Sequence, residues 1–162
     1  RVFGRPTDER SEVMTTWDDR HLYIAARFQL KDADSLKAEA ETASQVPSDD
    51  AFVVQFRRDK KAGYGELLVN AKGITLARLQ RREGNWNPEN IKASSRVHGS
   101  QWTTEITVPW KALPTPAEKP HTLRVQFIRK RHNQRYTFDC WSPILASWWG
   151  SFEPRFGRLK VQ

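Results

Sequence analysis

Apolar and polar residues alternate along short segments through most of the chain. In the segment from His21 to Phe28 every second residue is apolar, so one side of an extended strand would carry a continuous apolar face: Leu22, Ile24, Ala26 and Phe28. Residues 101–108 repeat the pattern, with one face made of Trp102, Thr104, Ile106 and Val108. About ten such segments are separated by turn-forming residues, and this spacing is typical of a β-sandwich or barrel.

Short polar turns connect several of these segments as predicted antiparallel hairpins. Glycine in two of the turns admits the positive φ that a tight hairpin needs. The arms and turns are, in chain order, 12–17 and 21–28 around 18–20, 66–71 and 74–79 around 72–73, and 91–98 and 101–108 around 99–100. Further strands are expected at 52–56, at 123–127, at 135–138, which should pair back on 123–127, and at 156–161, which closes the domain.

Two stretches are candidates for helical turns. Residues 34–44 are rich in Ala, Glu and Lys, which fits either a short helix or an irregular loop. Pro109 cannot continue a strand ladder, so residues 109–113 are expected to form one helical turn that ends the strand. The whole pattern predicts an all-β fold, an antiparallel two-sheet β-sandwich of jelly-roll type with one or two short helical turns.

Length and composition fit one folded domain over residues 1–162, because a chain of this size buries roughly two thirds of its unfolded surface around one core. The longest apolar runs, such as residues 22–26, are far shorter than the about 20 residues of a membrane-spanning helix, so no span is expected. The single cysteine, Cys140, excludes an intrachain disulfide and a zinc site of clustered cysteines. Because the chain opens without an initiator Met or a signal-like segment, we expect an excised part of a longer protein.

Three stretches, in chain order, resemble the family 9 carbohydrate-binding modules and similar sugar-binding domains: residues 17–24 (WDDRHLYI), residues 99–110 (GSQWTTEITVPW), and residues 141–143 (WSP) followed by 152–159 (FEPRFGRL). The resemblance implies two antiparallel sheets and noncatalytic binding of a glycan or oligosaccharide. It also implies a bacterial, secreted or cell-envelope parent protein, extracellular or periplasmic, whose other domains would be partners. The family has a further strand before residue 12, so the first strand is expected to be missing or supplied elsewhere.

One departure from the family pattern bears on function. Sugar-binding members resemble Trp, a few residues, then Asp-x-aliphatic-Glu, where the Trp clamps the sugar and the Glu bonds its hydroxyls. In this chain Asp50 is kept, Val53 stands in place of the Glu, and residues 44–48 contain no aromatic. The usual glucan-end site is therefore incomplete, which leaves open a structural or protein-interaction domain that has lost sugar binding.

Sugar recognition needs flat aromatic faces and fixed polar groups. Three tryptophans do not fit strand alternation and are candidates to stack on a ligand, with a loop plug as the alternative: Trp86, Trp148 and Trp149. Polar side chains that could bond hydroxyls are Gln55, Arg57, Asn85, Asn87 and Asn90. The other tryptophans are expected to pack in the core: Trp17, Trp102, Trp110 and Trp141.

The net charge of +8 and the sequence pI of about 9.9 would favour anionic partners. Basic residues cluster at 57–61, at 78–82, and at 129–131 with Arg135. An acidic polymer is thus an open alternative as partner, although we expect these clusters mainly to be solvated strand edges that prevent aggregation.

No cofactor is required by the sequence, but calcium is a candidate because the resembling family often holds it. Calcium prefers hard oxygen ligands, and the best local pairs are Asp32 with Asp34 and Asp49 with Asp50. No spaced loop of oxygen ligands surrounds them. Asp49 could instead cap the start of its strand.

Catalysis is not expected. Glu66 and Glu105 could serve as an acid and base pair, and Cys140 with His132 as a thiol nucleophile, but no motif surrounds either pair. Similar sandwich domains in some redox proteins bind heme through Met with His or Lys. The only methionine, Met14, is more readily explained as a buried filler, and its candidate partners would be His21, His98, His121 and His132.

Overall fold

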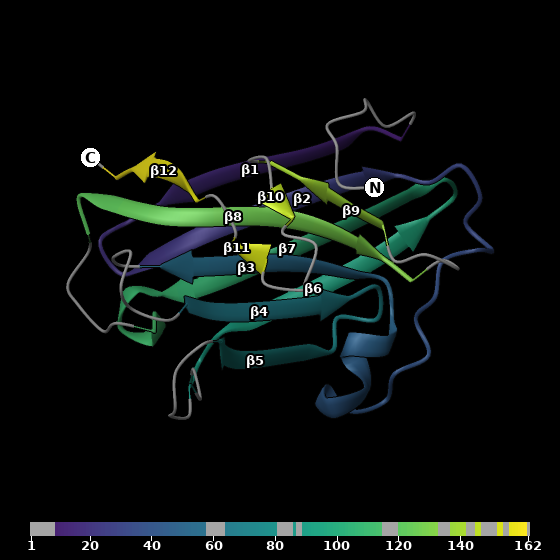
Figure 1. Cartoon of the computed structure of the whole chain (residues 1–162), viewed down its shortest axis with the longest axis horizontal. Coiled ribbons are helices and arrows are strands. Elements are labelled where there is room, and N and C mark those ends of the chain that lie inside the picture. The colour runs from purple at the N-terminus through teal and green to yellow at the C-terminus, as the bar shows by residue number, and fades with distance from the viewer. Residues whose placement is uncertain are drawn as a thin grey trace.

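Two antiparallel sheets dominate the computed structural model, which describes residues 9–57, 64–80, 86, 89–114, 120–132, 137–141, 145–146, 152–153 and 156–161 (Figure 1). The four-stranded sheet has the order β1-β2-β7-β6, and the six-stranded sheet has the order β12-β8-β3-β4-β5, with β9 also paired to β8. A separate two-stranded sheet joins β10 and β11. The all-β, two-sheet prediction is confirmed.

The strands of the four-stranded sheet are β1 (Ser11–Trp17), β2 (His21–Gln29), β6 (Lys92–His98) and β7 (Gln101–Pro109). Those of the six-stranded sheet are β3 (Ala51–Arg57), β4 (Tyr64–Asn70), β5 (Thr75–Gln80), β8 (Thr122–Arg131), β9 (Thr137–Cys140) and β12 (Gly157–Lys160). The short pair is β10 (Leu145–Ala146) and β11 (Phe152–Glu153). Two 3-10 segments are η1 (Ala43–Ser48) and η2 (Trp110–Ala112).

The main core lies between the two sheets and follows from the period-two pattern. Alternate residues of β2 and β7 face alternate residues of β3 and β8 in one cluster, whose largest fully buried side chains include Trp102, Phe28, Phe52 and Phe56. The ring centroids of Phe28 and Trp102 lie 4.7 Å apart. Each such fully buried side chain contributes about 1.5–3 kcal/mol relative to an exposed one, so this cluster holds the sheets together.

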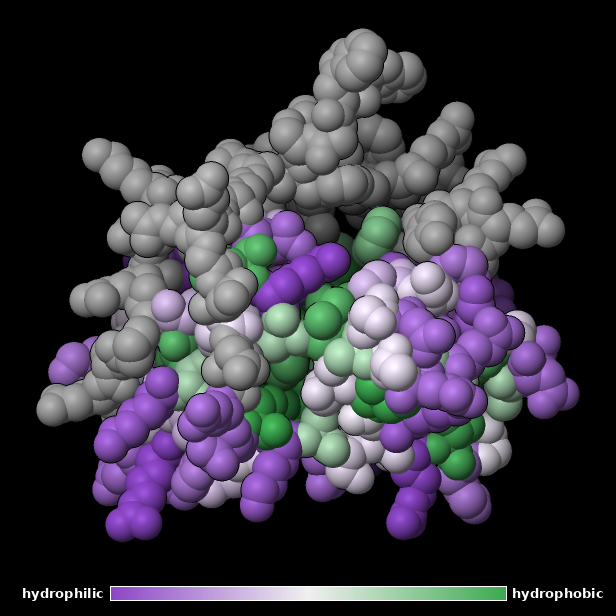
Figure 2. Space-filling model, turned by 90° about the horizontal axis from the view of Figure 1, so that it is seen from below, coloured by the Kyte–Doolittle hydropathy of each residue, from purple (hydrophilic) through white to green (hydrophobic). Residues whose placement is uncertain are grey.

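The edge of the sandwich along β5 shows how the core is closed at one side. Hydrophobic side chains gather near the middle of this view, between polar side chains on both flanks (Figure 2). Ala77 of β5, Ala93 of β6 and Ile91 are partly buried and pack against the main core. Small and branched apolar residues therefore fill the seam where β5 and β6 approach.

The hairpin between β1 and β2 is fixed by one aspartate. The Asp18 carboxylate accepts hydrogen bonds at 2.7 Å from the backbone N–H of Arg20, from that of His21 and from the Tyr23 hydroxyl. The Tyr23 hydroxyl is the largest cause that lowers the pKa of Asp18 to about 2. Trp110 Nε1 donates to the Asp18 carbonyl oxygen at 3.0 Å, which ties η2 to this turn.

The sequence predicted the hairpins well and the connections less well. All three predicted hairpins are present, and both turn glycines have positive φ, 83° at Gly73 and 55° at Gly99. The helical turn after Pro109 is confirmed as η2. Residues 34–42 are irregular, the 3-10 turn follows them at η1, and β9 begins at Thr137, after residues 133–136, which lie outside the described part.

Trp102 and Trp110 are buried and Trp17 packs against the core, as predicted. The prediction for Trp141 was wrong, because its side chain is 53% exposed. Trp141 follows β9, and its ring contacts Phe127, with centroids 5.5 Å apart, and lies against Gly157. Within the described residues no helix has the length and apolar character of a membrane span.

Gly157→Ala is expected to destabilise the fold, because a Cβ at this position would lie 2.1 Å from Cζ3 of Trp141. The free energy of unfolding should fall by about 1–3 kcal/mol, the usual cost of overpacking, as measured by urea denaturation. In a Trp141→Ala background the same substitution should cost much less. An equal cost in both backgrounds would show that the ring contact is not the cause.

Candidate functional site

The outer face of the six-stranded sheet carries rows of side chains that the core does not use. Val54 and Phe56 of β3 belong to the core, so Val53, Gln55 and Arg57 lie on the opposite face of the strand. Paired residues in an antiparallel sheet face the same side, and the strand registers therefore place the neighbours of each outer residue on the flanking strands.

A polar row crosses the middle of this face. Gln55 pairs with Gln126 on β8 and with Glu66 on β4, and Glu66 pairs with Arg78 on β5. Gln55 Nε2 donates to Glu66 Oε2 at 2.7 Å, while Arg78 donates to Glu66 Oε1 from Nε at 2.8 Å and from Nη2 at 2.6 Å. Gln80 Nε2 also donates to Glu66 Oε1, at 3.2 Å. Both carboxylate oxygens of Glu66 are therefore occupied.

One acceptor in this row is open. Gln55 is only 5% exposed, yet its Oε1 has no hydrogen-bond donor among the described residues. A buried acceptor without a partner costs about 1–3 kcal/mol. The amide is held in place by its bond to Glu66, so the open oxygen has a fixed position.

The aromatic neighbours of Arg57 lie at the end of β3. The Arg57 guanidinium carbon is 5.6 Å from the ring centroid of Phe156, and the Phe156 ring meets that of Tyr64 edge-on at 5.8 Å. Gln55 and Arg57 were both predicted as ligand-binding residues, and the structure brings them to the same face. Ligand binding by either residue stays a prediction.

Val53 lies next to this row in a second apolar cluster. The cluster includes Val46 of η1, Leu68 of β4 and Ile128 of β8, and Val53 is 4% exposed. The position that carries a hydroxyl-binding glutamate in sugar-binding members of the resembling family is thus apolar and closed. Any polar ligand site on this face must lie toward Gln55 and Arg57.

Trp86 has the arrangement of a loop plug. Its ring is partly buried against the main core, it meets Phe56 edge-on at 6.3 Å, and Nε1 donates to the Ala112 carbonyl oxygen at 2.9 Å. A Cβ on Gly65 would lie 2.2 Å from Pro114 Cγ and 2.9 Å from the Trp86 ring, so both side chains approach the strand where it has glycine. The other loop candidates, Asn85, Asn87, Trp148 and Trp149, lie outside the described residues, and Asn90 is exposed with φ of 66°.

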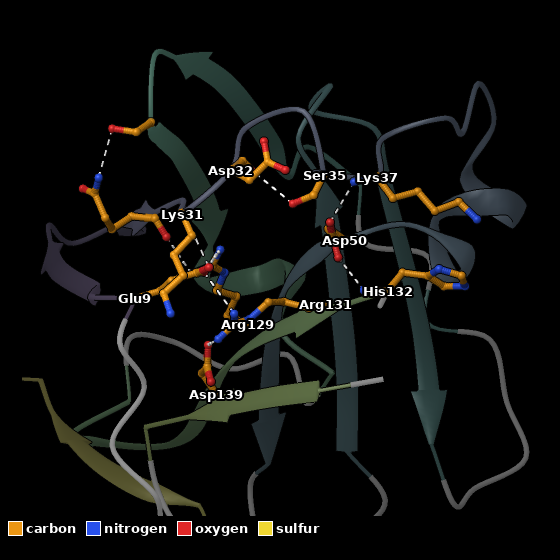
Figure 3. Close-up of polar contacts among 12 residues, drawn as sticks. Glu9, Lys31, Asp32, Ser35, Lys37, Asp50, Arg129, Arg131, His132 and Asp139 are labelled. Atoms are coloured by element: carbon orange, nitrogen blue, oxygen red, sulfur yellow. Dashed lines mark hydrogen bonds and ion pairs between the residues drawn. The ribbon is translucent and has the colours of Figure 1, made fainter. Parts of the chain in front are cut away.

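The acidic pair at the start of β3 binds backbone groups of the loop that precedes it. Asp49 accepts hydrogen bonds from the N–H of Glu39 at 3.0 Å, from that of Ala40 at 2.9 Å and from Asn70 Nδ2 at 2.9 Å. Asp50 accepts from the N–H of Lys37 at 2.8 Å and from that of His132 (Figure 3). For Asp49 these contacts fit the predicted alternative to calcium, a cap at the start of the strand.

The pair Asp32 and Asp34 is exposed and local. Asp32 Oδ1 accepts from the Asp34 N–H at 3.0 Å, a short turn of the loop after β2. In the described ranges no group of three or more His, Cys, Asp and Glu side chains is placed to hold a metal ion. Calcium binding at the four aspartates stays a prediction.

The basic run at 129–131 is split by strand alternation and is not a solvated edge. Arg129 is 3% exposed, with Nη2 2.8 Å from Glu9 Oε2 and Nη1 donating to the Gln29 carbonyl oxygen at 2.9 Å (Figure 3). Arg131 reaches Glu9 Oε2 at 3.0 Å and Asp139 Oδ2 at 2.6 Å. Burial lowers the pKa of Arg129, and the ion pairs oppose this effect. The expected solvated edge was wrong here, because β8 lies inside its sheet.

The residues named as catalytic or heme-binding candidates lie in different environments. Glu66 lies on the outer face of the six-stranded sheet, whereas Glu105 lies on the outer face of the four-stranded sheet, between buried neighbours that face the core. Burial raises the pKa of Cys140 to about 12, so its thiol is protonated and a poor nucleophile at neutral pH. Met14 is 55% exposed on the outside of β1, so the expectation of a buried filler was wrong.

Comparisons with known proteins place the fold. No protein-family model and no curated protein matches the chain. Among solved structures, a candidate carbohydrate-binding protein from Bacteroides uniformis is similar with a TM-score of 0.78 and 16% identity, over 97% of this chain and 80% of that one. This chain therefore shares the β-sandwich fold of that protein.

Two further solved structures with a similar fold are family 9 carbohydrate-binding modules. A family 9 carbohydrate-binding module from Caldicellulosiruptor kristjanssonii in complex with glucose has a TM-score of 0.67 and 13% identity, over 100% of this chain and 81% of that one. The module from the same organism in complex with cellotriose has a TM-score of 0.65 and 13% identity, over 99% and 78%. The predicted family 9-like fold is confirmed.

Asp49→Ala should lower the free energy of unfolding by about 3 kcal/mol, because three hydrogen-bond donors lose their acceptor in a buried site. Urea denaturation with calcium and with a chelator should give the same loss, since the carboxylate serves backbone groups. Asp34→Ala, an exposed control, should change stability by no more than about 0.5 kcal/mol. A loss seen only in calcium would instead assign Asp49 to a metal site.

Proposed function

We propose that this chain is a noncatalytic carbohydrate-binding module of a larger bacterial protein, and that it binds its glycan on the outer face of the six-stranded sheet. The observation that carries the proposal is the row Gln55, Glu66 and Arg78 with its open Gln55 oxygen, on a fold shared with modules in complex with glucose and cellotriose. The proposal includes secretion to the extracellular space or the periplasm, because the glycan ligand is expected there.

The chemistry of the row suits binding rather than reaction. A sugar hydroxyl both donates and accepts hydrogen bonds, so it can accept from an accessible arginine beside the row while donating to another acceptor. Glycoside hydrolysis needs two carboxylates at a defined separation, one of them able to give up a proton. Glu66 is held by Arg78 and two amides, and no second carboxylate pairs with it in the described sheet.

The alternative is a structural or protein-interaction domain of the same fold. Val53 inside the apolar cluster and Trp86 packed as a plug favour it, because both remove features that sugar-binding members use. The open oxygen of Gln55 weighs against it, since a purely structural face gains nothing from a buried acceptor without a donor.

Gln55→Leu is expected to weaken glycan binding by about tenfold or more while changing the melting temperature by only a few degrees. Leucine removes the hydrogen bond to Glu66, which lowers the free energy of unfolding. It also removes the buried acceptor that has no donor, which raises it, so the two effects partly offset each other. Calorimetric titration with glucose, cellotriose and longer neutral and acidic oligosaccharides, with and without calcium, measures the affinity.

Glu105→Gln is the matched control, because it changes one polar residue on the outer face of the other sheet. It should bind like the unaltered protein. If no sugar gives a saturable signal, or if both variants lose affinity equally, the outer face of the six-stranded sheet is not the site and the interaction-domain alternative is preferred.

A further inference from the structure

Three arginines from distant parts of the sequence form a row on the same outer face. Arg57 of β3 pairs in register with Arg124 of β8, and Arg124 pairs with Arg158 of β12. Neighbouring strands lie about 4.8 Å apart, so the three side chains leave the sheet side by side. The row is adjacent to the Gln55 row, since Arg124 and Gln126 are successive outer residues of β8.

Two of the three guanidinium groups, those of Arg124 and Arg158, have no carboxylate partner among the described residues, whereas Arg78, Arg129 and Arg131 each have one. Like charges directly opposite one another on a sheet are destabilising. The arrangement is therefore costly in the isolated chain and would be relieved by an anion that contacts several of the arginines.

The surroundings give the row a defined shape. The guanidinium of Arg57 lies against the Phe156 ring, which itself meets Tyr64, so this end of the row is held by aromatic contacts. Arg158 is exposed and Arg124 is partly buried, so a ligand can reach both. A guanidinium offers a planar fork of donors that matches a carboxylate or sulfate in two parallel hydrogen bonds.

Protection of a sheet edge is the ordinary explanation for exposed arginines. It fits Arg158, because β12 is the end strand of the six-stranded sheet. It does not fit Arg124 or Arg57, because β8 and β3 are interior strands whose edges are already paired. Two of the three charges thus have no role in edge protection.

We propose that the glycan bound by this face is anionic, and that its carboxylate or sulfate groups pair with the row Arg57, Arg124 and Arg158, beside the buried Gln55 row. This inference rests on the proposed function, because it names the substrate class for the same face. It differs from the neutral glucose and cellotriose of the similar modules.

The test compares matched charged and neutral ligands by calorimetric titration. The probes are an oligogalacturonate against its methyl ester, and dextran sulfate against dextran. The charged member of at least one pair should bind about tenfold or more tightly than its neutral partner at low salt and should weaken as salt is raised. The pair that shows the preference distinguishes carboxylate from sulfate.

The variant is the double substitution Arg124→Gln with Arg158→Gln, which spares Arg57 and its aromatic contacts. It should lose the preference for the charged member and keep the binding of neutral sugar. The matched control is Arg27→Gln with Arg96→Gln, which removes the same charge from the outer face of the other sheet, where both flank Thr103 in register. It should keep the preference, and melting curves verify that both variants are folded.

Two results would overturn the inference and leave the proposed function intact. One is equal affinity for the charged and neutral members of both pairs. The other is an equal loss of preference in the two double variants, which would mean that net charge alone attracts the anion. If neither charged nor neutral glycans bind, the proposed function itself fails and the row is not a sugar site.

Discussion

The alternation of side chains on β3 and β8 is the constraint on which both the core and the candidate site depend. These strands lie in the interior of the six-stranded sheet, so each has one face against the other sheet and one face directed away from it. Phe52, Val54 and Phe56 fill the inner face in contact with Phe28 and its neighbours. A shift of one residue in register would bury polar side chains in the core and expose these aromatics, so the core fixes the positions of Gln55 and Arg57.

Glu66 determines what chemistry the outer face can perform. Its carboxylate accepts from Arg78, Gln55 and Gln80, so the polar row is rigid and the negative charge is already paired. A carboxylate in that state holds its neighbours in position. The row can therefore present hydrogen-bonding groups in fixed places, which is the requirement for recognition of hydroxyls.

The sequence was sufficient for the fold because strands and tight turns are local signals. The hairpins around Gly73 and Gly99 need only alternation and a residue that tolerates positive φ. Trp141 was misplaced because its environment depends on where β9 ends and on the approach of Gly157, which are not local. The η1 turn and the short β10 and β11 pair contain too few residues to show a periodic pattern of apolar positions, so the sequence did not predict them.

The site could be predicted only in part, for the same reason. Alternation alone puts Gln55 and Arg57 on one face, so both were within reach of sequence reasoning. Glu66 was considered only as a catalytic group, because its register with Gln55 and Arg78 was unknown. No sequence signal connects Arg124 and Arg158 to Arg57, since the three lie in separate segments.

The basic residues that cluster in the sequence are not the ones that cluster in the structure. Residues adjacent in the chain point to opposite faces of a strand, so the run at 129–131 divides, with Arg129 and Arg131 directed to Glu9 and Lys130 to the Pro47 and Asp49 carbonyl oxygens. Residues adjacent across strands stay together whatever their distance in sequence. The row Arg57, Arg124 and Arg158 is an example, because strand pairing brings these three positive charges of a chain with net charge +8 to one surface. Charges gathered on one surface can attract an anionic ligand together.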